Sequence, residues 1–166
     1  MSGFNIGNVG GNVSMDAGGD IVGGDKNTTT TTTTITIGFK QDQDKQKFVG
    51  QIEELRKQLR QVKSDIEDVD GIDEDDKDAI IMELMQQVKA LKTAKDMAEE
   101  LPTKQEPSQE KRDAIEAPLN GVDGVVKKVT EMFNKAADIG DKVRKVNNLK
   151  LILPILISAR HLFGLP

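Results

Sequence analysis

Apolar residues recur at alternating spacings of four and three between residues 48 and 69. This spacing is typical of a helix that buries one narrow stripe of its surface. Three heptads follow one another, and Glu, Lys, Arg and Gln fill the flanking positions. The pattern predicts a coiled-coil-type helix from about Asp42 to Val69, with a seam that consists of Ile52, Leu55, Leu59, Val62 and Ile66.

A second periodic segment follows an Asp-Gly pair at residues 70–71, which breaks the first helix. Asp73 is the expected N-cap, because a carboxylate there accepts a free backbone N–H and more acids follow in the first turn. Apolar residues continue to Ala98, and Pro102 ends the segment. Since few residues separate the two helices, residues 41–101 are expected to form an antiparallel hairpin.

A polar linker with two prolines occupies residues 102–110. The same alternation of four and three resumes at Ile115 and continues to Val143. It predicts a third amphipathic helix within residues 111–148, which Pro118 is expected to kink or delay.

The last segment, residues 149–166, contains an apolar stretch with Pro154 in its middle. It is shorter than the roughly 20 residues that a membrane span needs. Three interpretations stay open: a buried helix packed on the bundle or on another subunit, an interfacial membrane anchor, and a membrane-inserting segment. The residues expected to contact a subunit or lipid are Leu151, Ile152, Leu153, Ile155, Leu156 and Ile157.

Residues 1–40 have a different composition, rich in Gly, Asn and Thr, with seven consecutive threonines at 28–34. Gly, Asn and Asp favour tight corners, and β-branched residues between them favour strands. We expect a β-arch, solenoid-like or stacked-strand segment that neighbouring chains complete, with a disordered leader as the alternative. The residues expected to carry self-assembly are Ile6, Val9, Val13, Ile21, Val22, Ile35 and Ile37.

The run GNVGGNVSMDAGGDIVGGDKN at residues 7–27 resembles the short Gly-Asn and Gly-Asp β repeats that begin many bacterial conflict-system proteins. It also resembles, more loosely, the β-solenoid motifs of amyloid signalling proteins. The resemblance implies a segment that templates assembly and passes a signal to a membrane-active effector.

Charge is distributed unevenly along a chain of net charge −5. Residues 41–119 hold 13 basic and 21 acidic residues, a net −8, whereas residues 120–166 hold eight basic and four acidic residues, a net +4. The acidic middle argues against nucleic acid as a partner, and the basic end suits acidic protein surfaces or anionic lipid.

Residues able to perform chemistry are scarce. There is no cysteine, and His161 is the single histidine, which excludes thiolate chemistry and His-rich metal sites. A calcium loop built around Gly71 would need acids where Ile66 and Lys77 stand. A phosphate loop fails because Asp25 precedes the only candidate lysine. We expect no cofactor, no metal and no catalytic residue, so the chain is not expected to be an enzyme.

The expected fold is mainly α, with an N-terminal β segment, then a coiled-coil-type hairpin and a long third helix. The expected function is self-assembly into a homo-oligomer or filament through the β segment and the helical seams. With no basic n-region and apolar stretch at the N-terminus, we expect a cytoplasmic location. The alternatives are a membrane-associated effector of a bacterial defence system, whose apolar tail engages lipid, and an adaptor whose helices bind another protein.

Overall fold

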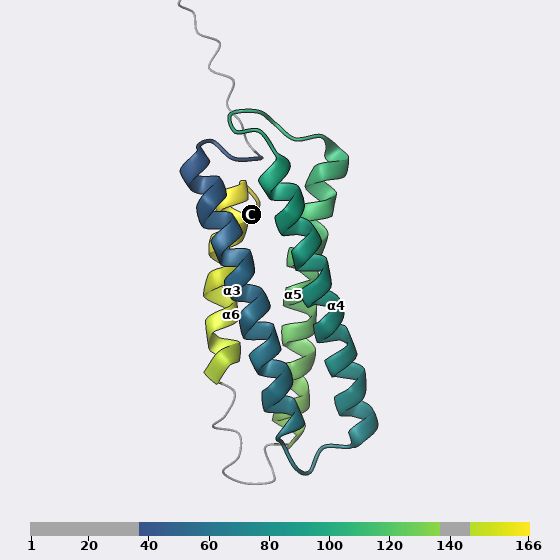
Figure 1. Ribbon diagram of the computed structural model, residues 1–166. Coiled ribbons are helices and arrows are strands. Elements are labelled where there is room, and N and C mark those ends of the chain that lie inside the picture. The colour runs from purple at the N-terminus through teal and green to yellow at the C-terminus, as the bar shows by residue number, and fades with distance from the viewer. Residues whose placement is uncertain (1–36, 137–146) are drawn as a thin grey trace, which may run out of the picture. The chain divides into compact units, whose positions relative to one another are not determined.

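The computed structural model describes residues 37–136 and 147–166, which form four helices arranged as an antiparallel bundle (Figure 1). Helix α3 packs against both α4 and α6, and α5 packs against α4 and, less extensively, against α6. The helices therefore form a ring in which α4 and α6 lie across the core from each other. Their bounds are Asp42–Glu67 for α3, Glu74–Glu100 for α4, Gln109–Ala136 for α5 and Asn147–Phe163 for α6.

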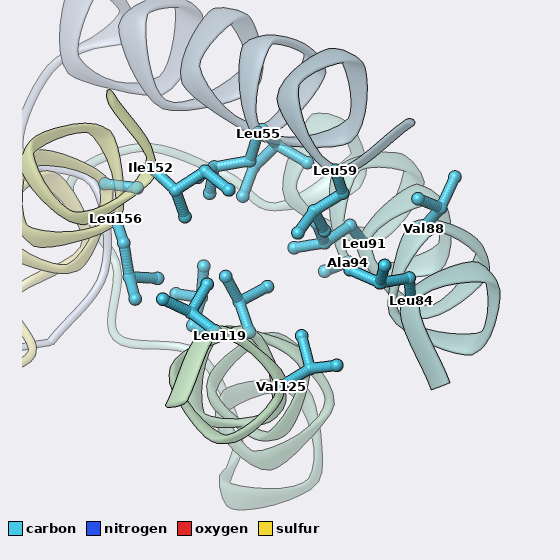
Figure 2. Close-up of a cluster of buried hydrophobic side chains, with 14 of the residues drawn as sticks. Leu55, Leu59, Leu84, Val88, Leu91, Ala94, Leu119, Val125, Ile152 and Leu156 are labelled. Atoms are coloured by element: carbon cyan, nitrogen blue, oxygen red, sulfur yellow. The ribbon is translucent and has the colours of Figure 1, made fainter. Parts of the chain in front are cut away.

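Aliphatic side chains from all four helices converge on one core (Figure 2). Helix α3 contributes its whole heptad seam, and α4 and α5 contribute stripes of the same spacing. Figure 2 shows Leu55 and Leu59 of α3 facing Ile152 and Leu156 of α6 on one side and the α4 side chains on the other. With few aromatic residues, this close packing of branched aliphatic groups supplies most of the burial that stabilises the bundle.

The two ends of α4 are fixed by side chains that satisfy free backbone groups. The Asp73 carboxylate accepts a hydrogen bond from the Asp75 backbone N–H at 3.0 Å, so the expected N-cap is confirmed. At the other end, the Lys45 Nζ of α3 donates to the carbonyl oxygens of Glu99 at 3.1 Å and Leu101 at 2.9 Å. A lysine at this end also complements the helix dipole.

Residues 37–40 form a short strap across the end of the bundle where α6 finishes. The Gly38 N–H donates to the Phe163 carbonyl at 2.8 Å, and the Lys104 N–H donates to the Phe39 carbonyl at 2.8 Å. The ring of Phe39 lies 5.2 Å, centroid to centroid, from both Phe48 and Phe163. Tilted and edge-on contacts of this kind add to the apolar burial of the rings. The strap therefore ties the start of α3 to the end of α6.

The expected fold class is wrong. Residues 37–136 and 147–166 contain no strand, and the expected hairpin, third helix and tail are instead parts of one four-helix bundle. The physical reason lies in the tail: Ile152 and Leu156 of α6 are 0% and 2% exposed and close a core that three helices would leave open. Pro154 lies inside α6, and Pro118 inside α5, without ending either helix.

The expected N-terminal β segment lies almost wholly outside the described residues, as do residues 137–146 of the expected third helix. Of the expected assembly residues, Ile37 alone is described. It is in a bend and packs, half-buried, against the helical core. The others lie outside the described residues: Ile6, Val9, Val13, Ile21, Val22 and Ile35.

Candidate self-association surface

The heptad seam of α3 is enclosed within its own chain. Each of the five seam residues has 0% of its surface exposed. A neighbouring subunit therefore has no access to the seam while the bundle is folded. The residues are Ile52, Leu55, Leu59, Val62 and Ile66.

The apolar stretch of α6 divides into a buried half and an exposed half. Ile152 and Leu156 lie in the core, and Ile155 is half-buried at its edge. The exposed fractions are 50% for Leu151, 43% for Leu153 and 53% for Ile157. At about 100° per residue, these three side chains lie on either side of the exposed Pro154. We call the surface formed by Lys150, Leu151, Leu153, Pro154, Ile157 and His161 the α6 outer face.

One other large apolar side chain in the described part of the chain is exposed to a similar extent, Met82 on α4, at 60%. Single exposed apolar residues are normal on protein surfaces, but a group of three on one short helix is a recognised mark of an interaction site. None of the described helices is long and apolar enough to cross a membrane.

The α6 outer face is also basic. Helix α6 contains no acidic residue, and both Lys150 and His161 on this face are exposed. Between described residues, no ion pair involves a side chain of α6, in contrast to the other three helices. The positive charge on the α6 outer face is therefore not neutralised by described side chains, and it lies beside the exposed apolar residues.

The contact between α3 and α6 contains polar groups at its edge. The Gln51 amide donates to the Ser158 hydroxyl at 2.7 Å, and the Asn148 amide donates to the Asp65 carboxylate at 2.8 Å. Gln58 is only 8% exposed, and its Oε1 has no hydrogen-bond partner. A buried oxygen without a partner costs free energy. The contact between α3 and α6 is therefore less stable than an apolar contact would be.

The contact between α3 and α4 is instead reinforced by charge. The Glu53 carboxylate lies 3.1 Å from Lys95 Nζ and 2.7 Å from the Arg56 guanidinium. The hydrogen bond from Lys95 lowers the pKa of Glu53, aided by the positive charge of Arg56, and the same hydrogen bond raises the pKa of Lys95. Arg56 also donates to the Val88 carbonyl at 3.2 Å, which joins it to α4.

A cleft of about 350 Å³ lies between the start of α4 and the last turns of α5. Its lining combines the apolar side chains of Ile72, Ile80 and Met132 with charged residues of both signs: Asp73, Asp76 and Glu131, and Lys128 and Lys135. Among the described residues, no group of three or more His, Asp or Glu side chains is arranged to hold a metal ion. The cleft therefore joins an apolar lining to side chains of both charges, and its charge does not favour a basic partner over an acidic one.

A scan against protein-family models and searches of curated proteins and of solved structures found no match to this chain.

Sequence reasoning treated residues 151–157 as one apolar unit and so missed the division between core and outer face. Applying the helical period to this stretch would have separated Ile152 and Leu156 from Leu151, Leu153 and Ile157. The same period separates Met82 from the α4 seam, because Met82 lies about 160° around the helix from the buried Leu84.

Proposed function

We propose that this chain is a non-enzymatic protein that assembles with copies of itself through the α6 outer face and through residues 1–36. The observation that supports the proposal is the exposure of Leu151, Leu153 and Ile157 on a helix whose core side is already filled. Three neighbouring aliphatic side chains at about half exposure form a patch that gains free energy when another surface covers it.

The size of that gain indicates why a second contact is needed. Full burial of one Leu or Ile side chain contributes about 1.5–3 kcal/mol, so covering the exposed half of three contributes roughly 2–4 kcal/mol. Losing the translational and rotational freedom of two molecules costs at least about 4 kcal/mol. The α6 outer face alone therefore supports only weak association, and a second association element on the same chain would multiply it through effective concentration.

Residues 1–36 are the candidate for that second element. Their sequence contains many Gly, Asn and Thr residues and few large apolar ones, so they are poorly suited to bury a core alone. The compact unit that contains the four helices begins at Ile35, so residues 1–34 lie outside it. Association through residues 1–36 stays a prediction from the sequence.

The test is the mass in solution, by light scattering, of four full-length or shortened proteins. The wild type is expected at a multiple of the 18.2 kDa chain mass. Ile157→Asp and deletion of residues 1–34 are each expected to lower the mass while keeping the helical circular-dichroism spectrum. Asn120→Asp, which adds the same charge at an exposed position of α5, is the control and should leave the mass unchanged. A wild type that stays monomeric at every concentration would overturn the proposal.

A further inference from the structure

The helices α4 and α6 lie on opposite sides of the core, with α3 and α5 between them (Figure 2). The exposed sides of α4 and α6 therefore point in opposite directions. The four large apolar side chains that the described residues expose are divided between these two sides: Met82 on α4, and Leu151, Leu153 and Ile157 on α6.

The exposed side of α4 has the opposite charge to the α6 outer face. Asp75, Asp78 and Met82 are spaced by three and four residues, so they lie on one side of the helix, and all three are exposed. Asp75 and Asp78 form no ion pair with described side chains. We call Asp75, Asp78 and Met82 the α4 acidic face.

Charge argues against two copies that meet through α6 alone. An isologous, antiparallel pair of α6 helices centred near Pro154 would place Lys150 of each copy close to Arg160 of the other, with no acidic side chain on either helix. Like charges facing each other across a contact are unfavourable, whereas the α4 acidic face offers the carboxylates of Asp75 and Asp78 beside the exposed Met82.

We propose that the α6 outer face of one copy docks on the α4 acidic face of the next. The proposal rests on the self-assembly proposed above and names the surfaces that meet. Such a contact is heterologous, because two different surfaces of the chain take part. Since the two faces point in opposite directions, every added copy leaves one face of each kind free. The assembly is therefore open-ended and grows as a filament instead of closing as a dimer.

The absence of cysteine from the chain allows a direct test by engineered disulfides in the full-length protein. The variants are Met82→Cys, Ile157→Cys and the double variant, each exposed to mild oxidation and examined by non-reducing gel electrophoresis. A disulfide forms only where two Cα atoms come within about 7 Å, so it reports which faces meet. The double variant is expected to give a ladder of covalent multimers. An equal mixture of the two single variants is expected to give a covalent dimer and nothing larger.

The matched control is Lys57→Cys combined with Ile157→Cys, since the Lys57 side chain is 73% exposed but lies on α3. It should give no more covalent product than the Ile157→Cys variant alone.

Strong dimer formation by Ile157→Cys alone would overturn the proposal in favour of an isologous α6 pair. Absence of the 82–157 disulfide in a protein that still assembles would also overturn it. If that protein floats with phosphatidylserine vesicles, the α6 outer face docks on lipid instead. A monomeric wild type would instead refute self-assembly itself, so the two failures are distinguishable.

Discussion

Helices α3 and α6 pack side by side in the same bundle and use their apolar residues differently. On α3, the large apolar side chains of the seam are fully buried, and the exposed positions are polar apart from Gly50. On α6, half of the apolar stretch is buried and the other half is exposed. The regular spacing of α3 is thus satisfied within one chain, whereas α6 has more apolar surface than the bundle can cover. We infer that an apolar surplus beyond the seam, not the seam itself, marks the surface that meets a partner.

The difference follows from helical geometry. Spacings of four and three keep the α3 side chains within one stripe that faces the core. In α6, residues 151, 152, 153, 155, 156 and 157 are all apolar, so they surround much of the helix. A helix that is apolar on several sides is normally enclosed on several sides, and α6 lies at the outside of a four-helix bundle.

The largest loss of stability is expected for a charged residue placed in the α3 seam. Leu59→Asp places a carboxylate at a fully buried position and is expected to lower the free energy of unfolding by about 3–5 kcal/mol. Arg60→Asp, at the adjacent exposed position, should change it by less than about 0.5 kcal/mol. Urea denaturation followed by circular dichroism measures both, and equal midpoints would show that the seam is not a core.

The next largest effect is expected at two adjacent residues of α6, of which one is buried and the other exposed. Leu156→Asp should lower the free energy of unfolding by about 3–4 kcal/mol, because Leu156 is 2% exposed. Ile157→Asp should leave stability almost unchanged and lower the mass of the assembly, because Ile157 is 53% exposed. Unfolding and light scattering on the same samples separate the two roles. A similar loss of stability in both variants would contradict the division of α6 into two halves.

The strap that joins α3 to α6 gives an intermediate effect. Gly38 has a φ of +112°, and an added Cβ would lie 2.8 Å from Pro107 Cδ, so Gly38→Ala should cost about 1–3 kcal/mol. Gly50→Ala is the matched control, because Gly50 lies inside α3 with no atom within 4 Å of the added Cβ. It should instead stabilise the protein by about 0.5–1 kcal/mol. Thermal melting of both variants should therefore show shifts of opposite sign.

A smaller effect is expected at the polar contact between α3 and α6. Gln58→Met keeps the length of the side chain and removes the buried Oε1 that has no partner. It also removes the hydrogen bond that Gln58 Nε2 donates to Glu54, a carboxylate exposed enough for water to take its place. It should stabilise the bundle by about 1 kcal/mol. Gln61→Met, at an exposed position one turn further along α3, should have little effect. A destabilised Gln58→Met variant would indicate that the polar group is needed where it lies.

The smallest effect concerns pH and the charged contact between α3 and α4. The pKa of Glu53 is lowered from its ordinary value of 4.5 in the folded protein, so its ionised form stabilises the fold. That contribution is complete above this value and is lost as the pH falls below it through the lowered pKa. The melting temperature of the wild type should therefore fall slightly more than that of Glu53→Gln when both are moved from neutral pH into this acidic range. Parallel curves would show that solvent screens the pair completely.

Those parts of the fold that depend on local order follow from the sequence alone. The spacing of Ile52, Leu55 and Leu59 defines a buried stripe in any helix, and Asp73 caps a helix through a bond to its own neighbours. Helix ends at 67–73 and 101–108 follow from turn residues and proline within a few positions. The single histidine and the absence of cysteine also exclude thiolate chemistry and histidine-rich metal sites, whatever the tertiary structure.

The tertiary structure alone decided which surfaces remain after packing. An apolar run such as 151–157 is compatible with a core helix, a subunit contact or a lipid contact, because hydrophobicity has no direction until neighbours are placed. Packing against α3 and α5 covers Ile152 and Leu156, and it leaves Leu151, Leu153 and Ile157 outside. The same packing sets α4 opposite α6, so that an acidic surface and a basic one face away from each other. Such relations join residues about 70 positions apart, and they arise only when the whole ring of helices closes.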